Sequence, residues 1–274
     1  MVQYYNFNQL DQFIEAVWDF YKNNKRDFLW RNKNPEPYHV VVSEIMLQQT
    51  QTSRVAIKFL EFIEKFPSFE KLAQAERVDV IATWVGLGYN RRAVALHEIA
   101  KTIVREFDGK LPHCVETLKP FKGLGHATAS SIVAFAFNVP TIFIETNIRT
   151  VFIHSFFNKE QEVPDQLLLP LIEKTVCKAN PREWYYALMD YGVYLKKEFK
   201  NPSRKSKHHI IQSSFEGSDR QIRGAIIKLL SQKKQLEIAQ LFDLLEFDKN
   251  RIKQQCDKLV KEGMLINNNN NLLF

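Results

Sequence analysis

Apolar residues recur at helical spacing along most of this chain. Within residues 8–24 they fall on one helix face, as an amphipathic helix requires, at Leu10, Phe13, Ile14, Val17 and Phe20. Residues 53–66 repeat the pattern, and turn signals such as NPEP, FPSF and LPH separate the periodic segments at short intervals. Because no run alternates with the period of two that strands show, the pattern predicts an all-α body of many short helices.

A change in composition divides the chain near residue 215. In NPSRKSKHHIIQSSFEGSD, residues 201–219, Pro, Ser, Gly and charged residues replace the apolar periodicity. Downstream, DRQIRGAIIKLLSQ, QLEIAQLFDLLEF and DKNRIKQQCDKLVKEG each predict an amphipathic helix. MLINNNNNLLF predicts a hairpin, because Asn tolerates left-handed backbone angles. We assign residues 1–215 to a helical body and residues 216–274 to a C-terminal module.

The order of elements in residues 216–274 resembles a winged-helix domain. In such domains the third helix commonly enters the major groove of DNA. A helical module for protein interaction or dimerisation has the same outline, because a fold does not fix a function.

Composition and charge narrow the class of protein. The 274 residues are 45% hydrophobic and 25% charged, as in globular proteins, and the formal charge of +7 favours a polyanionic partner. The segment KKEFKNPSRKSKHH, residues 196–209, holds six Lys or Arg and two His beside one Glu, and is either a nucleic-acid-binding stretch or a solvated linker. We expect no membrane span and no secretion signal, and therefore a cytoplasmic protein.

A glycine-rich turn is the most specific motif. In LKPFKGLGHATASSIVAFAF, residues 118–137, we predict a helix that ends at Leu118, a turn through Gly123 and Gly125, and a second helix from about His126. Glycine allows the backbone to turn tightly and to approach another group closely at both positions. Small side chains follow on the second helix, as a close-packed hairpin needs, at Ala127, Ala129, Ala134 and Ala136. Amides at such a turn form an anion site, so the motif predicts a phosphate contact.

Four collinear motifs resemble a known family. SEIMLQQTQT (43–52), WVGLGYNRRAVALH (84–97), FKGLGHATA (121–129) and IETNIRTV (144–151) resemble those of the helix-hairpin-helix DNA glycosylases, most of all the MutY-type adenine glycosylases. The resemblance implies two helical subdomains flanking a cleft, one of about residues 26–140 with the hairpin and one of residues 1–25 plus 141–215. It also implies a monomeric base excision repair enzyme of the nucleoid, which acts on double-stranded DNA containing a mismatched or damaged base.

Glu44 is the first candidate catalytic residue. It stands among apolar residues in VVVSEIML, where burial would raise the pKa of a carboxyl and suit it to general acid catalysis near neutral pH. The resemblance implies that Glu44 handles protons at the departing adenine and at the attacking water. A buried carboxylate that caps a neighbouring helix is the structural alternative.

Glu145 is the second candidate, and it departs from the family pattern. The resemblance places it where the family has a catalytic aspartate. A glutamate could also stabilise a cationic sugar through its charge. Its extra methylene displaces the carboxylate by more than about one ångström unless the backbone retreats, and such a misplacement can cost about a hundredfold in rate. We therefore expect either a site rebuilt around Glu145 or a reduced or different activity.

The resemblance also implies residues that contact DNA. Gln49 and Tyr89 correspond to residues that enter the base stack when the target base is flipped, although Tyr89 could instead be a core residue. Asn90 follows Tyr89 where the family usually has a second Tyr. Asn147 and Arg149, just beyond Glu145, are candidates for phosphate contacts.

The hairpin bears on the reaction type. Together with Gly123 and Gly125, Ala127 belongs to the predicted DNA-binding turn. Members that also cleave the DNA backbone carry a Schiff-base lysine at the position of Ala127. Because alanine has no nucleophile, we expect a monofunctional glycosylase.

The cysteine count excludes the family's usual cofactor. Most relatives bind an iron-sulfur cluster through four cysteines, the first of which corresponds to Lys196. The chain has only three widely spaced cysteines, Cys114, Cys177 and Cys256, and no CxxC motif. We expect no cofactor and no metal, and suggest that charges such as those of Lys205 and Lys207 replace the phosphate contacts of the cluster loop.

The substrate follows less directly from the sequence. The C-terminal domain with which typical adenine mismatch glycosylases check for 8-oxoguanine is replaced by the winged-helix-like module. The resemblance implies adenine opposite 8-oxoguanine or guanine, with another mispaired or damaged base as the alternative. A non-catalytic lesion-binding or DNA-binding protein is the alternative from another class.

Overall fold

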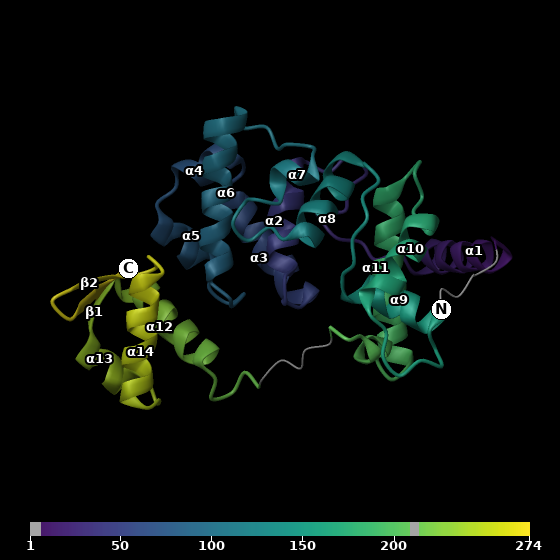
Figure 1. Ribbon diagram of the computed structural model, residues 1–274. Helices are drawn as coiled ribbons and strands as arrows, with labels where there is room; N and C mark the ends of the chain where they lie inside the picture. Colours follow the sequence, from purple (N-terminus) through teal and green to yellow (C-terminus); the bar gives the residue numbers. More distant parts are fainter. Residues whose placement is uncertain (1–6, 209–213) are drawn as a thin grey trace. The chain divides into compact units, whose positions relative to one another are not determined.

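The computed structural model describes residues 7–208 and 214–274, and most of them are helical (Figure 1). The helices of the body are α1 (Phe7–Asn24), α2 (Pro37–Leu47), α3 (Thr52–Lys65), α4 (Phe69–Gln74), α5 (Arg77–Trp84), α6 (Arg91–Phe107), α7 (Val115–Leu118), α8 (His126–Phe137), α9 (Thr146–Phe156), α10 (Asp165–Thr175), α11 (Pro181–Glu198) and the 3-10 helix η1 (Pro202–Lys205). The prediction of a body of many short helices is confirmed. No helix within the described ranges is long and apolar enough to cross a membrane.

The chain forms two compact units, each built from three segments. The first unit takes the described residues of Met1–Val40, His113–Pro120 and Leu124–Ile211, and the second takes those of Val41–Pro112, Phe121–Gly123 and Gln212–Phe274. The C-terminal module thus belongs to the second unit. The division into domains at residue 215 stays a prediction.

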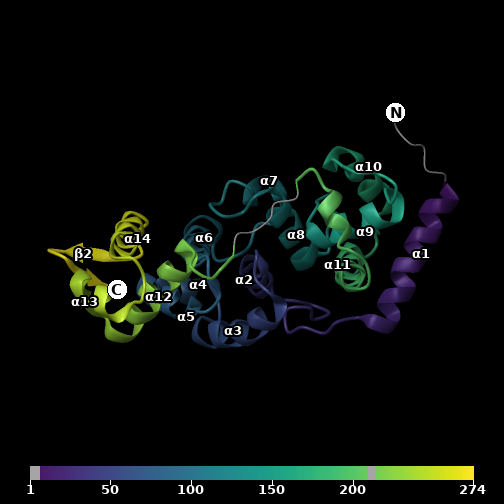
Figure 2. The ribbon, with the colours of Figure 1, turned by 90° about the horizontal axis from the view of Figure 1, so that it is seen from below.

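Aromatic side chains hold α1, α9 and α11 together in the first unit. The ring centroid of Phe13 from α1 lies 5.0 Å from that of Phe152 in α9 and 6.2 Å from that of Trp184 in α11. Figures 1 and 2 both show α9 beside α11. Gly192 of α11 permits this approach, because a Cβ there would lie 2.5 Å from the carbonyl oxygen of Asn147.

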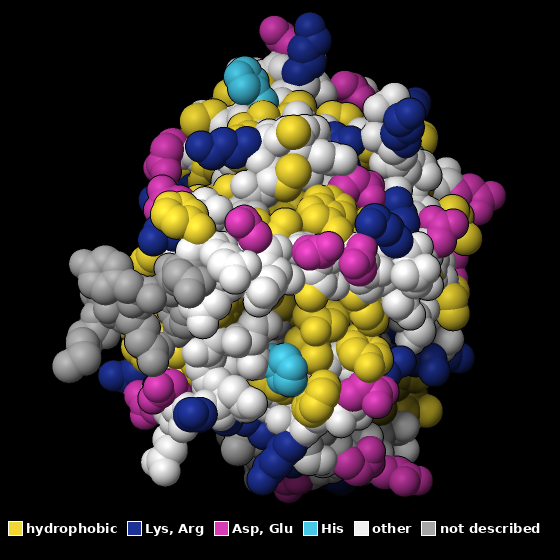
Figure 3. All heavy atoms as spheres, turned by 90° about the vertical axis from the view of Figure 1, so that its right-hand side faces the viewer, with side chains coloured by type: hydrophobic (Ala, Val, Ile, Leu, Met, Phe, Trp, Pro, Cys, Tyr) yellow, Lys and Arg dark blue, Asp and Glu magenta, His cyan; other side chains and the backbone are white. Residues whose placement is uncertain are grey.

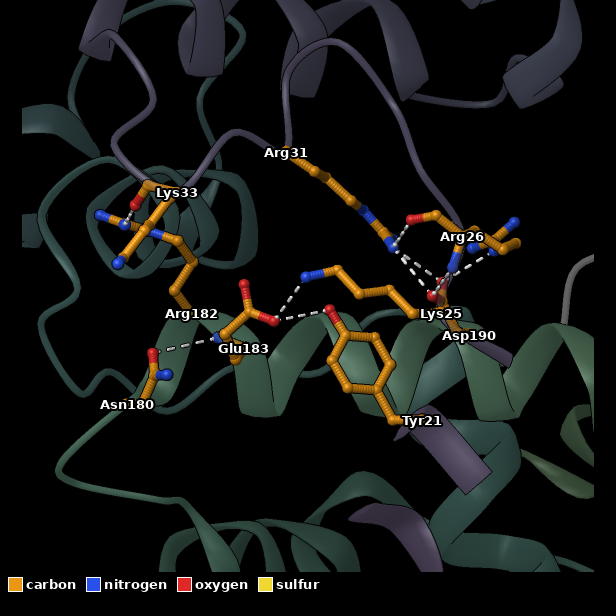
Figure 4. Close-up of polar contacts among 9 residues, drawn as sticks. All are labelled: Tyr21, Lys25, Arg26, Arg31, Lys33, Asn180, Arg182, Glu183 and Asp190. Carbon is orange, nitrogen blue, oxygen red and sulfur yellow. Dashed lines mark hydrogen bonds and ion pairs between the residues drawn. The ribbon is translucent and has the colours of Figure 1, made fainter. Parts of the chain in front are cut away.

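A buried charge network ties the segment after α1 to α11 (Figure 4). The carboxylate of Asp190 accepts hydrogen bonds from Arg31 Nη1 at 2.9 and 3.0 Å and from Arg26 Nε at 2.7 Å. The Arg31 guanidinium also lies 4.4 Å from the ring centroid of Tyr186. Burying Asp190 is tolerated because both arginines compensate its charge, and removing either would leave a buried carboxylate short of partners.

The exposed side of the first unit shown in Figure 3 carries both signs of charge. Acidic and basic side chains are mixed around apolar ones on this face, which is the side of Figure 1 with α1 and α10. Phe7, Leu29 and Leu167 are among the exposed apolar residues of the unit. Nucleic-acid-binding surfaces are dominated by basic side chains, so we do not place DNA on this face.

In the second unit, the C-terminal module comprises α12 (Asp219–Lys233), β1 (Gln235–Glu237), α13 (Ile238–Leu244), α14 (Lys249–Lys261), β2 (Ile266–Asn268) and β3 (Asn271–Leu273). Its apolar core is continuous with α5 and α6. Ile81 of α5 is buried in the same cluster as Ile222 and Ile226 of α12, and Val94 of α6 packs against it. The module is therefore fastened to this unit by apolar burial.

The three strands form one antiparallel sheet in the order β1-β3-β2. The predicted hairpin is confirmed, with Asn269 and Asn270 in its turn at φ angles of 50° and 67°. The prediction of a helix across all of QLEIAQLFDLLEF is wrong for Gln235–Glu237, which forms β1. Tertiary pairing overrides the helical pattern there, because Leu236 lies opposite Leu272 and both are buried. The winged-helix character of the module stays a prediction.

The basic segment 196–208 is packed on the first unit. The amide of Val163 donates to Lys205 O at 2.8 Å, the amide of Lys207 donates to Val163 O at 3.2 Å, and Lys205 Nζ donates to Asn158 O at 2.6 Å. Ser203 is buried. The segment is therefore not a free linker at these residues, although most of its charged side chains are exposed to solvent, and His209 lies outside the described residues.

Candidate active site and nucleic-acid-binding residues

The structure confirms the predicted hairpin at residues 115–137. Helix α7 ends at Leu118 and α8 begins at His126. Gly123 has a φ of +94°, and a Cβ there would lie 3.0 Å from the Cβ of Ala95, so glycine is required. At Gly125 the φ of −74° suits any residue and a Cβ would meet nothing within 4 Å, so the turn itself does not require glycine there, and the predicted close approach of another group stays a prediction. Its open surroundings leave room for an external group to approach the backbone.

Ala127 lies in the first turn of α8, where it is partly exposed. Its methyl group offers no amine, and the nearest lysine in sequence, Lys122, lies before the hairpin glycines. The absence of lyase activity stays a prediction.

Glu44 lies in α2, a helix that is apolar around most of its circumference. Val40, Val41, Ile45 and Met46 are each 2% exposed or less, whereas Glu44 is partly exposed. The helix therefore fixes Glu44 on a buried scaffold with its side chain accessible, which is what a group that transfers protons requires.

Arg92, which was not among the predicted site residues, holds the C-terminal end of α2. Its Nη1 donates to Ile45 O at 2.9 Å, to Met46 O at 2.8 Å and to Gln48 O. Its Nη2 donates to Thr50 Oγ1 at 2.9 Å and to carbonyl groups of the loop that precedes α6. The last carbonyls of a helix lack intrahelical partners, so one buried guanidinium satisfies them. Burial lowers the pKa of Arg92 to about 10, which leaves it charged at neutral pH.

Gln49 and Tyr89, the two candidates for insertion into the base stack (the wedge residues), lie next to the segments that Arg92 connects. Gln49 comes two residues after α2 and has a φ of 55°, and Tyr89 precedes α6 and has a φ of 47°. Non-glycine residues in this left-handed region are strained by about 1–3 kcal/mol, and such strain is concentrated at functional sites. Gln48, beside Gln49, donates from Nε2 to Gly123 O at 3.3 Å, which connects this region to the hairpin turn.

Tyr89 contacts a residue of the C-terminal module. Arg220 of α12 donates from Nη1 to Tyr89 Oη at 2.7 Å, and its guanidinium carbon lies 5.4 Å from the ring centroid. The Arg92 guanidinium lies 5.5 Å from the same centroid. Tyr89 is partly exposed and contacts two cations, so it is not a core residue.

Glu145, in the first unit, caps α9. Its Oε1 accepts from the amides of Asn147 at 2.7 Å and Ile148 at 2.9 Å. Its Oε2 accepts from Asn147 Nδ2 at 3.1 Å. Aspartate is a preferred residue at this position, and the longer glutamate folds back to satisfy the same orphan amides. The carboxylate is thus held at the N-terminal end of α9 by hydrogen bonds to its first amides.

Lys196 is linked to Glu145 through Asn147. Its Nζ donates to Asn147 Oδ1 at 2.7 Å, which orients the amide so that Nδ2 faces Glu145. Burial lowers the pKa of Lys196, and the Glu145 carboxylate opposes that shift. Lys196 stands where the resemblance places the first cluster cysteine, so the position now supports the second candidate acid.

Arg149 is engaged by an acid of the same unit. Its Nε and Nη2 each donate to Asp165 at 2.8 Å, in a bidentate pair. The hydrogen bond from Arg149 lowers the pKa of Asp165. A phosphate contact by Arg149 stays a prediction, and it would have to share a guanidinium that Asp165 already orients.

The described residues contain no group of three or more His, Cys, Asp or Glu side chains that could hold a metal ion. Cys114 is exposed, Cys177 is partly exposed and Cys256 is buried.

Known proteins of one class are similar to this chain. Residues 42–173 match the HhH-GPD superfamily of base excision DNA repair proteins. The adenine DNA glycosylase of Mycobacterium tuberculosis (strain ATCC 25618 / H37Rv) is 26% identical over 272 residues, with 88% of each chain covered. That of Mycolicibacterium smegmatis is 29% identical over 272 residues, with 90% of each covered.

Solved structures share the fold. A thermostable thymine-DNA glycosylase matches with a TM-score of 0.60 at 22% identity, over 68% of this chain and 86% of that chain. A non-covalent endonuclease III–DNA complex matches with a TM-score of 0.60 at 15% identity, over 70% of this chain and 87% of that chain. The fold is that of the helix-hairpin-helix DNA glycosylases. The chain carries an HhH-GPD domain and is a homologue of adenine DNA glycosylases.

Proposed function

We propose that this protein is a monofunctional adenine DNA glycosylase of base excision repair, acting on adenine opposite 8-oxoguanine or guanine in double-stranded DNA. The observation that carries the proposal is the similarity to adenine DNA glycosylases, which extends over 90% of the chain in one relative. Glu44 on its apolar helix and Glu145 at the start of α9 supply the two carboxyl groups that base hydrolysis needs.

The reaction divides between the two acids. Glu44, in its protonated form, gives a proton to a ring nitrogen of the flipped adenine. The bond between this base and the sugar C1′ then breaks, and its electron pair leaves with the base. Glu145 stabilises the cationic sugar with its negative charge. Water attacks C1′ and returns a proton to the Glu44 carboxylate, which restores the starting acid.

The same residues account for the rest of the proposal. Ala127 stands at the position of the Schiff-base lysine, and Lys122 lies on the other side of the turn, so we expect the product to be an intact abasic strand. Three cysteines cannot supply the four thiolates of a cluster, and Lys196 donates a hydrogen bond where a thiolate would be needed, so no iron-sulfur cluster is required. Gln49 and Tyr89 fill the space left by the flipped base. The protein would act at the nucleoid, as a monomer.

The proposal is tested by single-turnover base release from duplexes with adenine opposite 8-oxoguanine, adenine opposite guanine, and uracil or thymine opposite guanine. Alkali added after the reaction cleaves the strand at abasic sites, whereas strand cleavage without alkali indicates lyase activity. We expect alkali-dependent cleavage of the adenine duplexes, lost in Glu44→Gln. Cleavage without alkali would refute the monofunctional assignment.

Glu145 needs a control that separates chemistry from folding, because it also caps α9. Glu145→Asp keeps a charged acceptor for the helix amides, whereas Glu145→Gln keeps the length and removes the charge. We expect Asp to retain activity and Gln to lose it at equal helicity. Tight binding of all duplexes without base release would instead favour a non-catalytic DNA-binding protein.

A further inference from the structure

A groove in the second unit is lined by both wedge residues and the C-terminal module. It measures about 440 Å³. One side comes from the end of α2, the loop before α6 and the start of α6, and the other side comes from α12 and α14. The proposed function assigns a role to Gln49 and Tyr89, but none to the other residues that line this groove.

Its charge favours an anion. The lining includes five basic side chains and one acidic side chain: Arg91, Arg92, Arg220, Arg223 and Lys258 against Asp219. Some of this charge is compensated by neighbours, since Glu262 accepts from Arg91 Nη2 at 2.5 Å and from Arg223 Nη2 at 2.5 Å. Lys258 is held more loosely, with its Nζ 3.8 Å from Asp219. A positive surplus remains along the groove.

Two buried donors in the lining lack an acceptor. Gln255 of α14 is 1% exposed and Arg92 is 9% exposed. Among the described residues, Gln255 Nε2 and Arg92 Nε have no partner in hydrogen-bond geometry. The pKa of the nearby Asp219 is lowered mainly by its hydrogen bond from Arg251, and Gln255 contributes least to that shift. An unsatisfied buried N–H costs about 1–3 kcal/mol, so such donors indicate a ligand that brings its own acceptors.

We propose that this groove binds a phosphodiester of the DNA strand next to Tyr89, with Lys258 and the Gln255 amide as ligands of the phosphate oxygens. The inference rests on the proposed function, because it places the DNA by the wedge residues. A phosphate offers negative charge and several acceptor oxygens, which matches both the surplus of cations and the orphan donors. The C-terminal module then helps to hold the duplex where the base is extruded, and Arg220 couples it to the wedge.

The alternative is that α14, the third helix of the module, enters the major groove. The two models differ in which residues of α14 contact the DNA. Lys258 lines the groove, whereas Lys253 is exposed on the same helix outside the lining. Lys258→Gln and Lys253→Gln are therefore a matched pair with the same change of charge. Gln255→Met removes the orphan donor at nearly constant volume and should not destabilise the free protein.

The experiment measures the dissociation constant for a duplex with a stable abasic analogue as a function of salt concentration. We expect Lys258→Gln to reduce the slope of log K against log salt by about 0.9, the value for one phosphate contact, and Lys253→Gln to leave the slope unchanged. Gln255→Met should weaken binding severalfold without lowering the urea midpoint. Equal slopes in wild type and Lys258→Gln, or an effect of Lys253→Gln alone, would overturn the proposal.

Two further arms separate the sources of failure. In the first, inorganic phosphate is added to the free protein in a thermal shift assay. If phosphate stabilises the wild type but not Lys258→Gln, and Lys258→Gln binds DNA as the wild type does, the groove binds a small anion and the proposal is overturned. Base release by wild type is measured in parallel. A slope changed by Lys258→Gln without base release supports the phosphate site and refutes the proposed function. Base release with unchanged slopes supports the proposed function and refutes the phosphate site.

Discussion

Replacing Arg92 with methionine should detach the end of α2 from the loop that carries Tyr89. Methionine fills much of the volume but donates no hydrogen bond. Two of the bonds that would be lost, to Ile45 O and Met46 O, are wholly buried. A hydrogen bond from a charged donor contributes about 1.5–3 kcal/mol, so these two alone predict a loss of about 3–6 kcal/mol in the free energy of unfolding.

The neighbouring residue supplies the control. Arg91 precedes Arg92 in α6, but its side chain is 72% exposed and its ion pair is with Glu262. Arg91→Met should therefore cost less than about 1 kcal/mol. Arg92→Lys should recover only part of the loss, because a compact ammonium cannot reach carbonyls on both sides as a planar guanidinium does.

Urea denaturation followed by circular dichroism measures the loss, and single-turnover base release measures its consequence for the site. We expect the rate to fall in Arg92→Met even where the protein is fully folded, because Gln49 and Tyr89 lose the anchor that keeps them in strained backbone angles. A loss in Arg92→Met no larger than that in Arg91→Met would refute the reasoning.

Three further outcomes are expected. Burial lowers the pKa of His97, so the folded state binds a proton at this residue less readily than the unfolded chain does. The free energy of unfolding should therefore decrease as the pH falls from about 6.5 to the folded-state pKa. In His97→Leu the urea midpoint should depend less on pH across that range. Gly123→Ala should destabilise the protein by about 1–3 kcal/mol because of its positive φ and the nearby Ala95, whereas Gly125→Ala should leave thermal stability unchanged and weaken DNA binding; equal melting temperatures for both would contradict the geometry. Lys196→Met should lower the rate of base release by about tenfold to a hundredfold at unchanged DNA affinity, and an unchanged rate would exclude a positioning role.

Local sequence signals predicted the elements but not the contacts between them. Apolar periodicity located the body helices, and the glycines and asparagines located the two hairpins, because each feature depends on neighbouring residues. The strand at Leu236 was missed because its pairing partner lies 36 residues away at Leu272, and the helical pattern carried no trace of that pairing. Nothing in the sequence distinguishes Arg92 from its neighbour Arg91, and only the fold shows that Arg92 is buried whereas Arg91 is exposed.

For the candidate site as well, the sequence predicted individual residues but not the contacts between them. The motifs identified Glu44, Glu145 and Tyr89 through the family resemblance. The contacts of their supporting residues were not predicted, such as that of Lys196 with Asn147 and that of Arg220 with Tyr89. A side chain that acts by orienting another has no preferred sequence spacing, so it is found only when tertiary structure is known.

The apolar core that Ile81 shares with α12 has a consequence for truncation. A chain shortened near residue 215 would lose the partners of Ile81, Val85 and Val94 and expose an apolar patch on α5 and α6. Such a fragment should aggregate or be degraded even if its catalytic residues fold correctly. The composition break is therefore a poor place to cut, and a premature stop codon downstream of the glycosylase motifs would be as damaging as one within them.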